Sequence, residues 1–367
     1  MKMTVKKTVK QSSRAAMNAS RIMVYLLAFT MTSQPLLAQV QVDQSAPAAN
    51  QAQIDQAPNG VPVVNIADPS AAGVSRNEFT ELNIGQEGLI FNNSREVTDT
   101  QLSGFITGNT QLSREATIIL NEVNGGSRSQ LQGFAEVAGQ GANLVIANPN
   151  GITCDGCGFI NTPRTTLSTG QAIISGGDLQ GFNVQGGDIS IQGAGLNANG
   201  TQQLDLLSRA ININAQLQGN QVNAILGRND VDYDDLSATE LEDDGSQTPL
   251  FALDASALGA LQAGQIRLIG TENGVGINIP TNVSASGGDI QISADGQLVI
   301  GNLNATGDVD LASTNDGVEI TDLAFGDNVD IEAATDINIS TETLVAATDS
   351  ISLNAQTLNQ QSNHLAD

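Results

Sequence analysis

The chain has 367 residues, with 39 acidic against 14 basic side chains and a formal charge of −25. All six basic residues before position 38 lie in a stretch without an acid, so the rest holds eight arginines against all 39 acids, a balance of −31. A polyanion has no electrostatic footprint for DNA or RNA, so no nucleic-acid partner is expected. One histidine and two cysteines exclude a histidine-based or four-cysteine metal site, and 3% aromatic residues exclude a core of large rings. No metal or cofactor is expected.

The first 38 residues have the pattern of a secretory signal peptide. A basic start is followed by the apolar run Ile22–Met31, which is too short to span a bilayer, and Ala38 supplies a small residue for cleavage. The alternative is a basic amphipathic anchor that stays attached. No later apolar run approaches the length of about 18 residues that a spanning helix needs, so the mature chain is expected to lack a membrane-spanning segment.

Beyond the signal, the composition predicts a disordered lead and then an all-β chain. Residues 39–60 are rich in Gln, Ala, Asp and Pro and have little to bury, so they are predicted to be disordered. From Val61 on, short alternating apolar runs separated by Gly, Asn and Asp predict strands. These runs are Val61–Ile66, Glu81–Ile84, Leu89–Asn92, Ala116–Leu120, Asn143–Ile146, Ile189–Ile191 and Ala210–Ile213. Short helices near 204–209 and 256–261 stay open as alternatives.

The last third of the chain has an internal period. One row of repeats begins at Ile290, Val309, Val329 and Ile351, and a second row, interleaved with it, begins at Leu298, Val318 and Ile337. Successive leads within a row are 19 to 22 residues apart. A period of about 20 residues with two or more strands per repeat predicts the coils of a parallel β-solenoid. The competing interpretation is a β-sandwich with regular hairpins.

The acidic segment 230–245 interrupts this pattern. Alternating aspartates make it begin like a calcium loop. The EF-hand template requires glycine at its sixth position and glutamate at its twelfth, where Asp235 and Leu241 stand. A solvated surface loop is therefore expected here.

Two stretches, Asn77–Ser94 and Ala116–Thr162, carry sequence motifs that are more informative about the class of protein than the composition is. Together they resemble the secretion domain of two-partner-secretion exoproteins, the filamentous-haemagglutinin family that includes adhesins and contact-dependent growth-inhibition proteins. The resemblance runs from about Val61 to at least Asn278, and the sequence CDGCGFIN is similar to the growth-inhibition/haemagglutinin branch. It implies a right-handed parallel β-helix with an N-terminal β cap and short extra-helical hairpins. The secretion domain is then expected at 61–280, and generic coils at 281–367, where family length suggests truncation.

The first family motif is Asn148-Pro149-Asn150-Gly151. It follows an apolar strand, and its order of Asn, Pro and Gly fits a type I turn. The resemblance implies that this turn lies in the region that the transporter partner requires.

The second family motif, Asn-Pro-Asn-Leu, aligns here with Asn109-Thr110-Gln111-Leu112. Only Asn109 and Leu112 match it, so only these two residues are carried over as secretion-motif positions.

The two cysteines, Cys154 and Cys157, stand in a C-D-G-C sequence. In an exported chain the leading interpretation is a local disulfide that clamps the loop after the turn, because such compartments permit disulfides. The alternative is a redox motif, which would require a thioredoxin-like βαβ pattern that this sequence lacks.

The resemblance implies a secreted or cell-surface protein that passes through the periplasm and is recognised by an outer-membrane β-barrel transporter with POTRA domains. The implied role is transporter targeting and nucleation of β-helix folding for an adhesin or growth-inhibition protein, not catalysis. Two alternatives stay open: a short secreted adhesin that contacts a host or bacterial receptor, and a polysaccharide-active β-helix enzyme using paired carboxylates.

Overall fold

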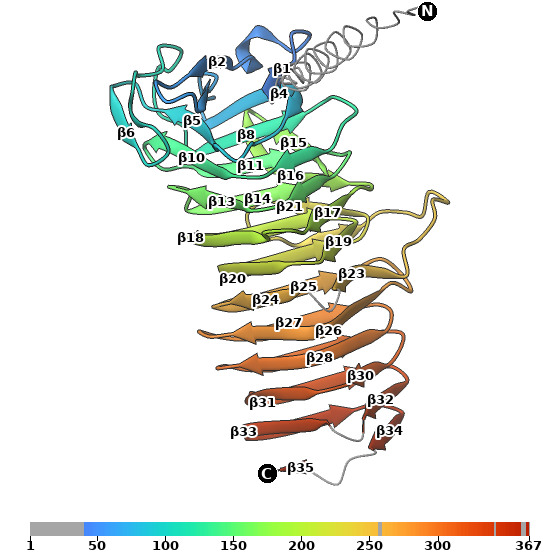
Figure 1. Cartoon of the computed structure of the whole chain (residues 1–367). Helices are drawn as coiled ribbons and strands as arrows, with labels where there is room; N and C mark the ends of the chain where they lie inside the picture. The colour runs from blue at the N-terminus through green and yellow to red at the C-terminus, as the bar shows by residue number, and fades with distance from the viewer. Residues whose placement is uncertain (1–39, 256–258, 341–342, 361–364, 367) are drawn as a thin grey trace, which may run out of the picture. The chain divides into compact units, whose positions relative to one another are not determined.

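A computed structural model describes residues 40–255, 259–340, 343–360 and 365–366 (Figure 1). The predicted signal peptide lies outside the described residues. The unit that begins at Val40 consists of coils stacked along one axis, and each full coil contributes a strand to three parallel ladders. The prediction of an all-β parallel β-helix is confirmed, and the β-sandwich alternative is wrong because neighbouring coils pair in parallel.

Each ladder pairs one strand of every coil with its counterpart in the next. Ladder 1 contains β4 (Val74–Leu82), β8 (Ile118–Val123), β11 (Asn143–Ala147), β14 (Arg164–Ser168), the second halves of β18 (Leu196–Ser208) and β20 (Gln216–Leu226), β25 (Gln265–Gly270), β27 (Ile290–Ala294), β29 (Val309–Ser313), and the second halves of β31 (Leu323–Ala333) and β33 (Leu344–Asn354).

Ladder 2 contains β9 (Ser129–Leu131), β12 (Ile152–Cys154), β17 (Asp188–Ile191), β19 (Ala210–Ile213), β23 (Phe251–Ala255), the first halves of β26 (Gly276–Ala285) and β28 (Leu298–Ala305), β30 (Val318–Ile320), β32 (Asp336–Ile339) and β34 (Thr357–Gln360). Ladder 3 contains β3 (Pro62–Asn65), β5 (Leu89–Asn93), β10 (Phe134–Gly139), β13 (Cys157–Ile160), the first halves of β18 and β20, β24 (Ala260–Ala263), the second halves of β26 and β28, the first halves of β31 and β33, and β35 (Leu365–Ala366).

The core is a column of aliphatic side chains inside the ladders. Ile290, Val309 and Val329 stack in register and are at most 1% exposed. The second predicted row, which begins at Leu298, also stacks in register. Both predicted periods are thus confirmed as coil repeats. Burial of such a side chain is worth about 1.5–3 kcal/mol, so every coil contributes to the core.

The N-terminal end of the helix is closed by antiparallel pairings. β1 (Val40–Val42) pairs with β4, and β2 (Gln53–Gln56) pairs with β3. A single 3-10 turn, η1 (Ala48–Asn50), lies between them. The predicted disorder of 39–60 was wrong for the described part, 40–60, because β1 and β2 satisfy backbone groups of strands at the open end of the solenoid.

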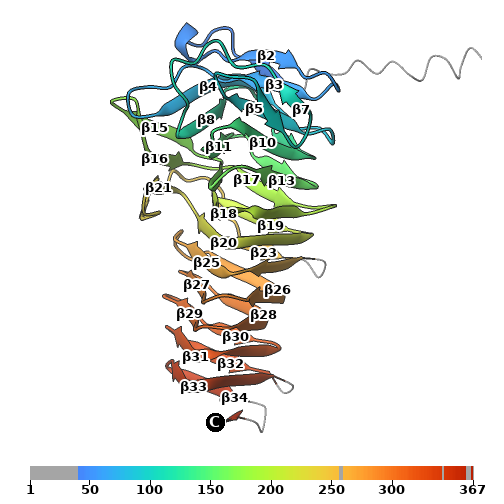
Figure 2. The same cartoon turned by 90° about the vertical axis from the view of Figure 1, so that its left-hand side faces the viewer.

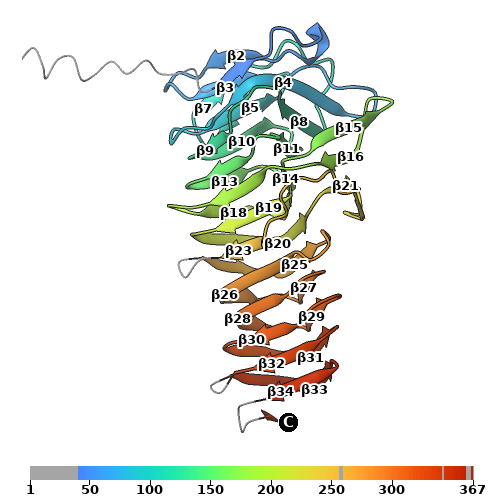
Figure 3. The ribbon, with the colours of Figure 1, turned by 90° about the vertical axis from the view of Figure 1, so that its right-hand side faces the viewer.

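Two antiparallel elements extend from the ladders. One is the hairpin of β6 (Thr98–Thr100) and β7 (Gly104–Ile106). The other is a four-stranded sheet of β15 (Gln171–Ser175), β16 (Asp178–Val184), β21 (Asn229–Asp232) and β22 (Ala238–Glu240), which lies along the flank of the coils (Figures 2 and 3).

Strands correct two of the predictions. The acidic segment 230–245 is not simply a solvated loop, because it supplies β21 and β22 and buries Val231, Tyr233 and Leu236 in a second apolar cluster. Residues 204–208 are in strand β18 and not in a helix. The other suggested helix, near 256–261, falls partly outside the described residues, and residues 260–263 are in strand β24.

Aspartates line up on the outer side of ladder 1. Asp310 and Asp330 are directly paired, and Asp308 and Asp289 are their neighbours. Burial raises the pKa of the Asp310 carboxyl, and the charges of the other three aspartates raise it further. Within the described part of the chain, Oδ1 of Asp330 is buried without a hydrogen-bond partner. The repulsion between these aspartates therefore lowers the stability of the folded state, although it does not prevent the strands from pairing.

We predict that Asp310→Asn stabilises the protein, because it removes the charge opposite Asp330 and offers that carboxylate an amide donor. A relieved cross-strand pair is worth about 0.5 kcal/mol at neutral pH. The folded state holds the Asp310 proton more tightly than the unfolded chain, so wild-type stability from this site rises as the pH falls through the raised pKa. The advantage of the variant, measured by thermal unfolding, should therefore shrink on acidification.

The matched control is Glu319→Gln, since the ladder neighbours of Glu319, Val299 and Asn338, are uncharged. An equal gain in both variants, or a gain for Asp310→Asn that does not depend on pH, would contradict the repulsion.

Candidate functional site

The Asn148–Gly151 motif forms the corner between ladder 1 and ladder 2. Strand β11 ends at Ala147 and β12 begins at Ile152. The Gly151 N–H donates to the Asn148 carbonyl at 2.9 Å, the i to i+3 bond of a β-turn. Gly151 has a φ of 101°, a conformation that side chains with a Cβ rarely adopt. The motif is therefore a tight corner of the solenoid.

Asn148 is fully buried, and its side chain and backbone together connect three coils. Its Nδ2 donates to the Ser127 carbonyl and to Ser129 Oγ, both at 3.0 Å, in the preceding coil. Its Oδ1 accepts from the Asn150 N–H at 2.9 Å, and its backbone N–H donates to Ser168 O in the following coil. No hydrophobic side chain at this position can replace these bonds.

Asn109 makes the same kind of turn at another corner. It is 2% exposed, and its Nδ2 donates to the carbonyls of Ile66 and Asn92 at 2.8 and 3.2 Å. Its Oδ1 accepts from the Gln111 N–H at 2.9 Å, as Asn148 does from the residue two positions on. The Leu112 N–H lies 3.4 Å from the Asn109 carbonyl, and the Leu112 side chain joins the main core.

Thr110 and Gln111, which replace the Pro and Asn of the family motif, therefore keep the turn, because the bond to Asn109 needs only the backbone N–H of Gln111. The two asparagines share no hydrogen-bond partner and do not form one joint site.

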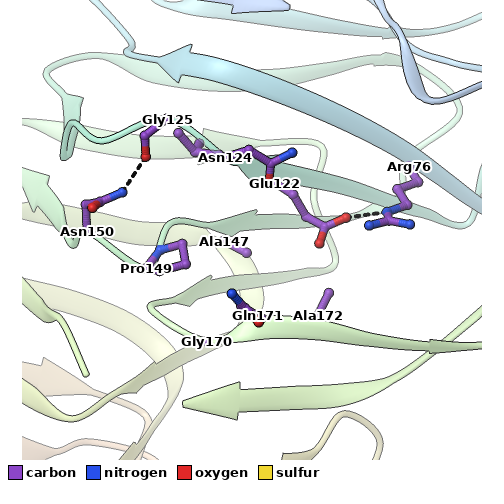
Figure 4. A pocket seen from close by; sticks show the side chains of 11 residues that line it. Arg76, Glu122, Asn124, Gly125, Ala147, Pro149, Asn150, Gly170, Gln171 and Ala172 are labelled. Carbon is purple, nitrogen blue, oxygen red and sulfur yellow. Dashed lines mark hydrogen bonds and ion pairs between the residues drawn. The ribbon is translucent and has the colours of Figure 1, made fainter. Parts of the chain in front are cut away.

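The exposed part of the first motif borders an open cleft of about 480 Å³ (Figure 4). Pro149 and Asn150 are exposed, and Asn150 Nδ2 donates to the Gly125 carbonyl at 2.6 Å. The cleft is lined by Arg76, Glu122, Val123, Asn124, Gly125, Ala147, Pro149, Asn150, Gly170, Gln171 and Ala172. It thus joins the motif to the start of β15 in the flanking sheet.

An ion pair forms the charged wall of this cleft. Arg76 Nε contacts a carboxylate oxygen of Glu122, and Arg76 also lies 3.5 Å from Glu78. Burial raises the pKa of the Glu122 carboxyl, and the hydrogen bond from Arg76 offsets only part of that rise. Burial lowers the pKa of Arg76, but the two glutamates outweigh it and raise that pKa overall. The cleft offers hydrogen-bonding groups, and its lining residues, all described, include no histidine, cysteine or lysine.

A second ion pair packs against the Asn148–Gly151 corner. Arg128 holds both carboxylate oxygens of Asp188, at 2.5 and 3.0 Å, and also donates to the Ile152 carbonyl. A Cβ on Gly151 would lie 2.5 Å from Arg128 Nη1 and 2.8 Å from Asp188 O. The motif glycine is required both for its backbone conformation and for this close contact.

Sequence reasoning missed Arg76, Glu122, Arg128 and Asp188. Their positions follow no motif. The available signal was the rarity of arginine in a chain that is otherwise acidic, since a scarce cation in such a chain favours pairing with a carboxylate.

The cysteines close the corner between ladders 2 and 3. Cys154 ends β12 and Cys157 begins β13, and the two are joined in a disulfide. Both are buried, and Gly156 between them has a φ of 88°. The bond therefore encloses a single turn inside the core and presents no exposed thiol.

We predict that Gly151→Ala destabilises the fold by about 2 kcal/mol or more, because it adds left-handed strain and a contact with the Arg128–Asp188 pair. Gly126→Ala is the matched control, since its φ lies outside that region and nothing occupies the space of an added Cβ. Chemical denaturation measures both. Equal stability of the two variants would show that the corner relaxes without cost.

These features define a class: a parallel β-helix whose N-terminal end is closed by antiparallel strands and whose corners are held by buried asparagines. The solved structure titled "Crystal structure of filamentous hemagglutinin secretion domain" matches it with a TM-score of 0.70 and 29% identity, over 86% of this chain and 99% of that one. Residues 38–300 match the family described as the TPS secretion domain. The chain belongs to this two-partner-secretion family, which confirms the resemblance.

Relatives of the chain carry the name CdiA. The chain is 43% identical over 307 residues to "Toxin CdiA" of Yersinia pestis, covering 83% of this chain and 9% of that protein. It is 44% identical over 330 residues to "tRNA nuclease CdiA" of Escherichia coli (strain NC101), covering 88% of this chain and 10% of that protein. The chain thus spans about a tenth of the length of these relatives.

Two kinds of feature are absent from the described residues. They contain no helix long and apolar enough to cross a membrane. They also contain no group of three or more acidic, histidine or cysteine side chains arranged to hold a metal ion.

Proposed function

We propose that residues 38–300 target this exoprotein to a dedicated outer-membrane β-barrel transporter, whose periplasmic POTRA domains recognise the chain. The chain then passes from the periplasm through the barrel and folds at the cell surface, where it serves a growth-inhibition or adhesin protein. The match of these residues to the TPS secretion domain carries this proposal. The region itself acts by binding and folding and not by catalysis, whatever activity the nuclease-named relatives hold elsewhere in their length.

The architecture supports folding in one direction. Each coil pairs with the coil before it and presents its own open edge to the next, so folding can begin at the capped N-terminal end and propagate. A chain with few aromatic residues and a balance of −31 resists collapse and aggregation while it is unfolded. Folding outside the cell would then draw the chain through the pore without a nucleotide.

Burial of the motif asparagines supports recognition before folding. Asn148 is 0% exposed and Asn109 is 2% exposed in the folded domain, so a transporter cannot contact either side chain there. In the unfolded chain both side chains are accessible. The periplasmic partner would bind the motif in the unfolded chain, and the folded protein would then bury it. Recognition would thus be reversible, because folding removes the recognised segment from the partner.

We predict that Asn148→Ala and Asn150→Ala both block release into the medium when the cognate transporter is co-expressed. Only Asn148→Ala should strongly destabilise the fold, since Asn150 is exposed and its side chain bonds only Gly125 and Asn148. Immunoblots of medium and periplasm, compared with thermal unfolding of refolded protein, separate the two effects.

Release of Asn150→Ala at the wild-type level, together with failure of Asn148→Ala, would show that the motif acts through stability alone and would contradict sequence recognition. Wild-type release of both variants would remove the motif from secretion altogether.

We predict that Cys154→Ala combined with Cys157→Ala leaves release mostly intact. The cysteines are three positions apart, so the cross-link constrains a very short loop and contributes about 2 kcal/mol. The double variant should melt at a lower temperature yet reach the medium in the presence of the transporter. Complete loss of release would instead assign the bond a role in export.

A further inference from the structure

One face of the solenoid carries no charge, although the mature chain has 39 acids. This neutral face is the outer side of ladder 3 from β18 to β33. Its strand segments are 196–200, 216–220, 260–263, 282–285, 302–305, 323–326 and 344–347, and none contains an acidic or basic residue. In the same coils, ladder 1 presents Asp310 and Asp330, and ladder 2 presents Asp254 and Glu319.

Amide and hydroxyl side chains form a straight column along the neutral face. Residues Asn197, Gln218, Gln262, Ser284 and Asn304 pair in register through successive coils. The residues between them point inward and are buried, as Leu217 and Leu261 show. Over these five strands the outward side chains thus form a regular row with one polar group about every 4.8 Å along the axis, and Phe325 and Ala346 continue the row in β31 and β33.

The column crosses a cleft of about 450 Å³, a volume typical of small-molecule sites. Asn199, Gln218, Gly219, Asn220, Gln262, Ala263, Gly264, Ser284 and Ser286 line it. Gln218 Oε1 accepts from Asn199 and Gln262 Oε1 accepts from Gln216, which orients both amides. Among the described residues neither Nε2 group has a protein partner, so both donors are available.

We infer that the neutral face binds a neutral polysaccharide, laid along the column with its sugar hydroxyls on the amides. Hydroxyls both donate and accept, as asparagine and glutamine amides do. An anionic polymer would be repelled by the surrounding charge, and a cationic partner would favour the acidic ladders instead. An uncharged, hydroxyl-rich ligand is not repelled by the surrounding acids and has no preference for the acidic ladders, so its hydrogen bonds favour the face without charge.

The size of the face argues against a second copy of the chain as its occupant. Seven strand segments of four or five residues cover roughly 500 Å² by standard strand spacings. A stable protein interface needs about 800 Å² from each partner. Two copies would also bring two strongly negative molecules together, whereas a single glycan strand needs only the width of the column.

Affinity gel electrophoresis of the full exported chain tests this inference. The probes are dextran, mannan and galactan as neutral polymers, with dextran sulfate as the anionic comparison. At least one neutral polymer should retard the protein, and dextran sulfate should not. The paired substitution Gln218→Glu with Gln262→Glu should raise the apparent dissociation constant at least tenfold, while Gln297→Glu, the same exchange at an exposed position just before β28, should leave it unchanged.

Three results would overturn the inference: no retardation by any neutral polymer, equal retardation of the paired variant and the control, or stronger retardation by dextran sulfate. Sedimentation of the same samples covers the remaining case. A dimer that the paired variant dissolves would make the face a self-association surface and not a glycan site.

Discussion

The parallel pairing of each coil with the next is the constraint on which the structure depends. Ile290, Val309 and Val329 occupy equivalent positions because a solenoid coil has no core of its own and must stack inward residues on those of its neighbour. The N-terminal coil has no preceding neighbour, so β1 and β2 supply antiparallel partners there. Strand edges that would otherwise be open are thus closed at that end.

The second requirement is a tight corner between strands. The chain must change direction from one ladder to the next while its backbone groups stay hydrogen-bonded. Asn148 and Asn109 meet it in the same way: one amide oxygen accepts from the N–H two positions on, and the amide nitrogen donates to carbonyls of other segments. A motif that looks like a recognition sequence is therefore also a structural joint. Both roles are compatible if the partner binds the unfolded motif before the corner folds.

The sequence predicted the ladder 1 and ladder 2 strands of the C-terminal coils, because their inward positions alternate with polar ones and only one side of each strand is buried. It failed at 204–208 since the flanking sheet covers the outer side as well: Leu206 lies in the main core and Leu207 in the second cluster. A strand buried on both sides loses its alternation and resembles a helix segment. The pairing of Val40–Val42 with β4 was missed for a related reason, as it depends on a long-range edge that local composition does not encode. The motif corner was predicted as a turn, whereas the arginine pairs behind it, which no local pattern encodes, were not.

Charge is distributed along the solenoid as unevenly as around it. Within the described chain, ion pairs involve Arg76, Arg128, Arg164, Arg209 and Arg228, and no basic residue follows Arg267 until His364. The N-terminal coils thus pair buried carboxylates with arginines, as Asp205 with Arg164 shows. Arg164 also stacks on the ring of Tyr233, which connects the coils to the segment of the flanking sheet. The acids of the later coils form no ion pair within the described chain; several accept hydrogen bonds instead, as Asp295 does from Gly274 and Thr314, and Asp308 from Asn328. Such coils are held together only by their neighbours, so an early rigid segment is what gives each later coil a surface on which to fold.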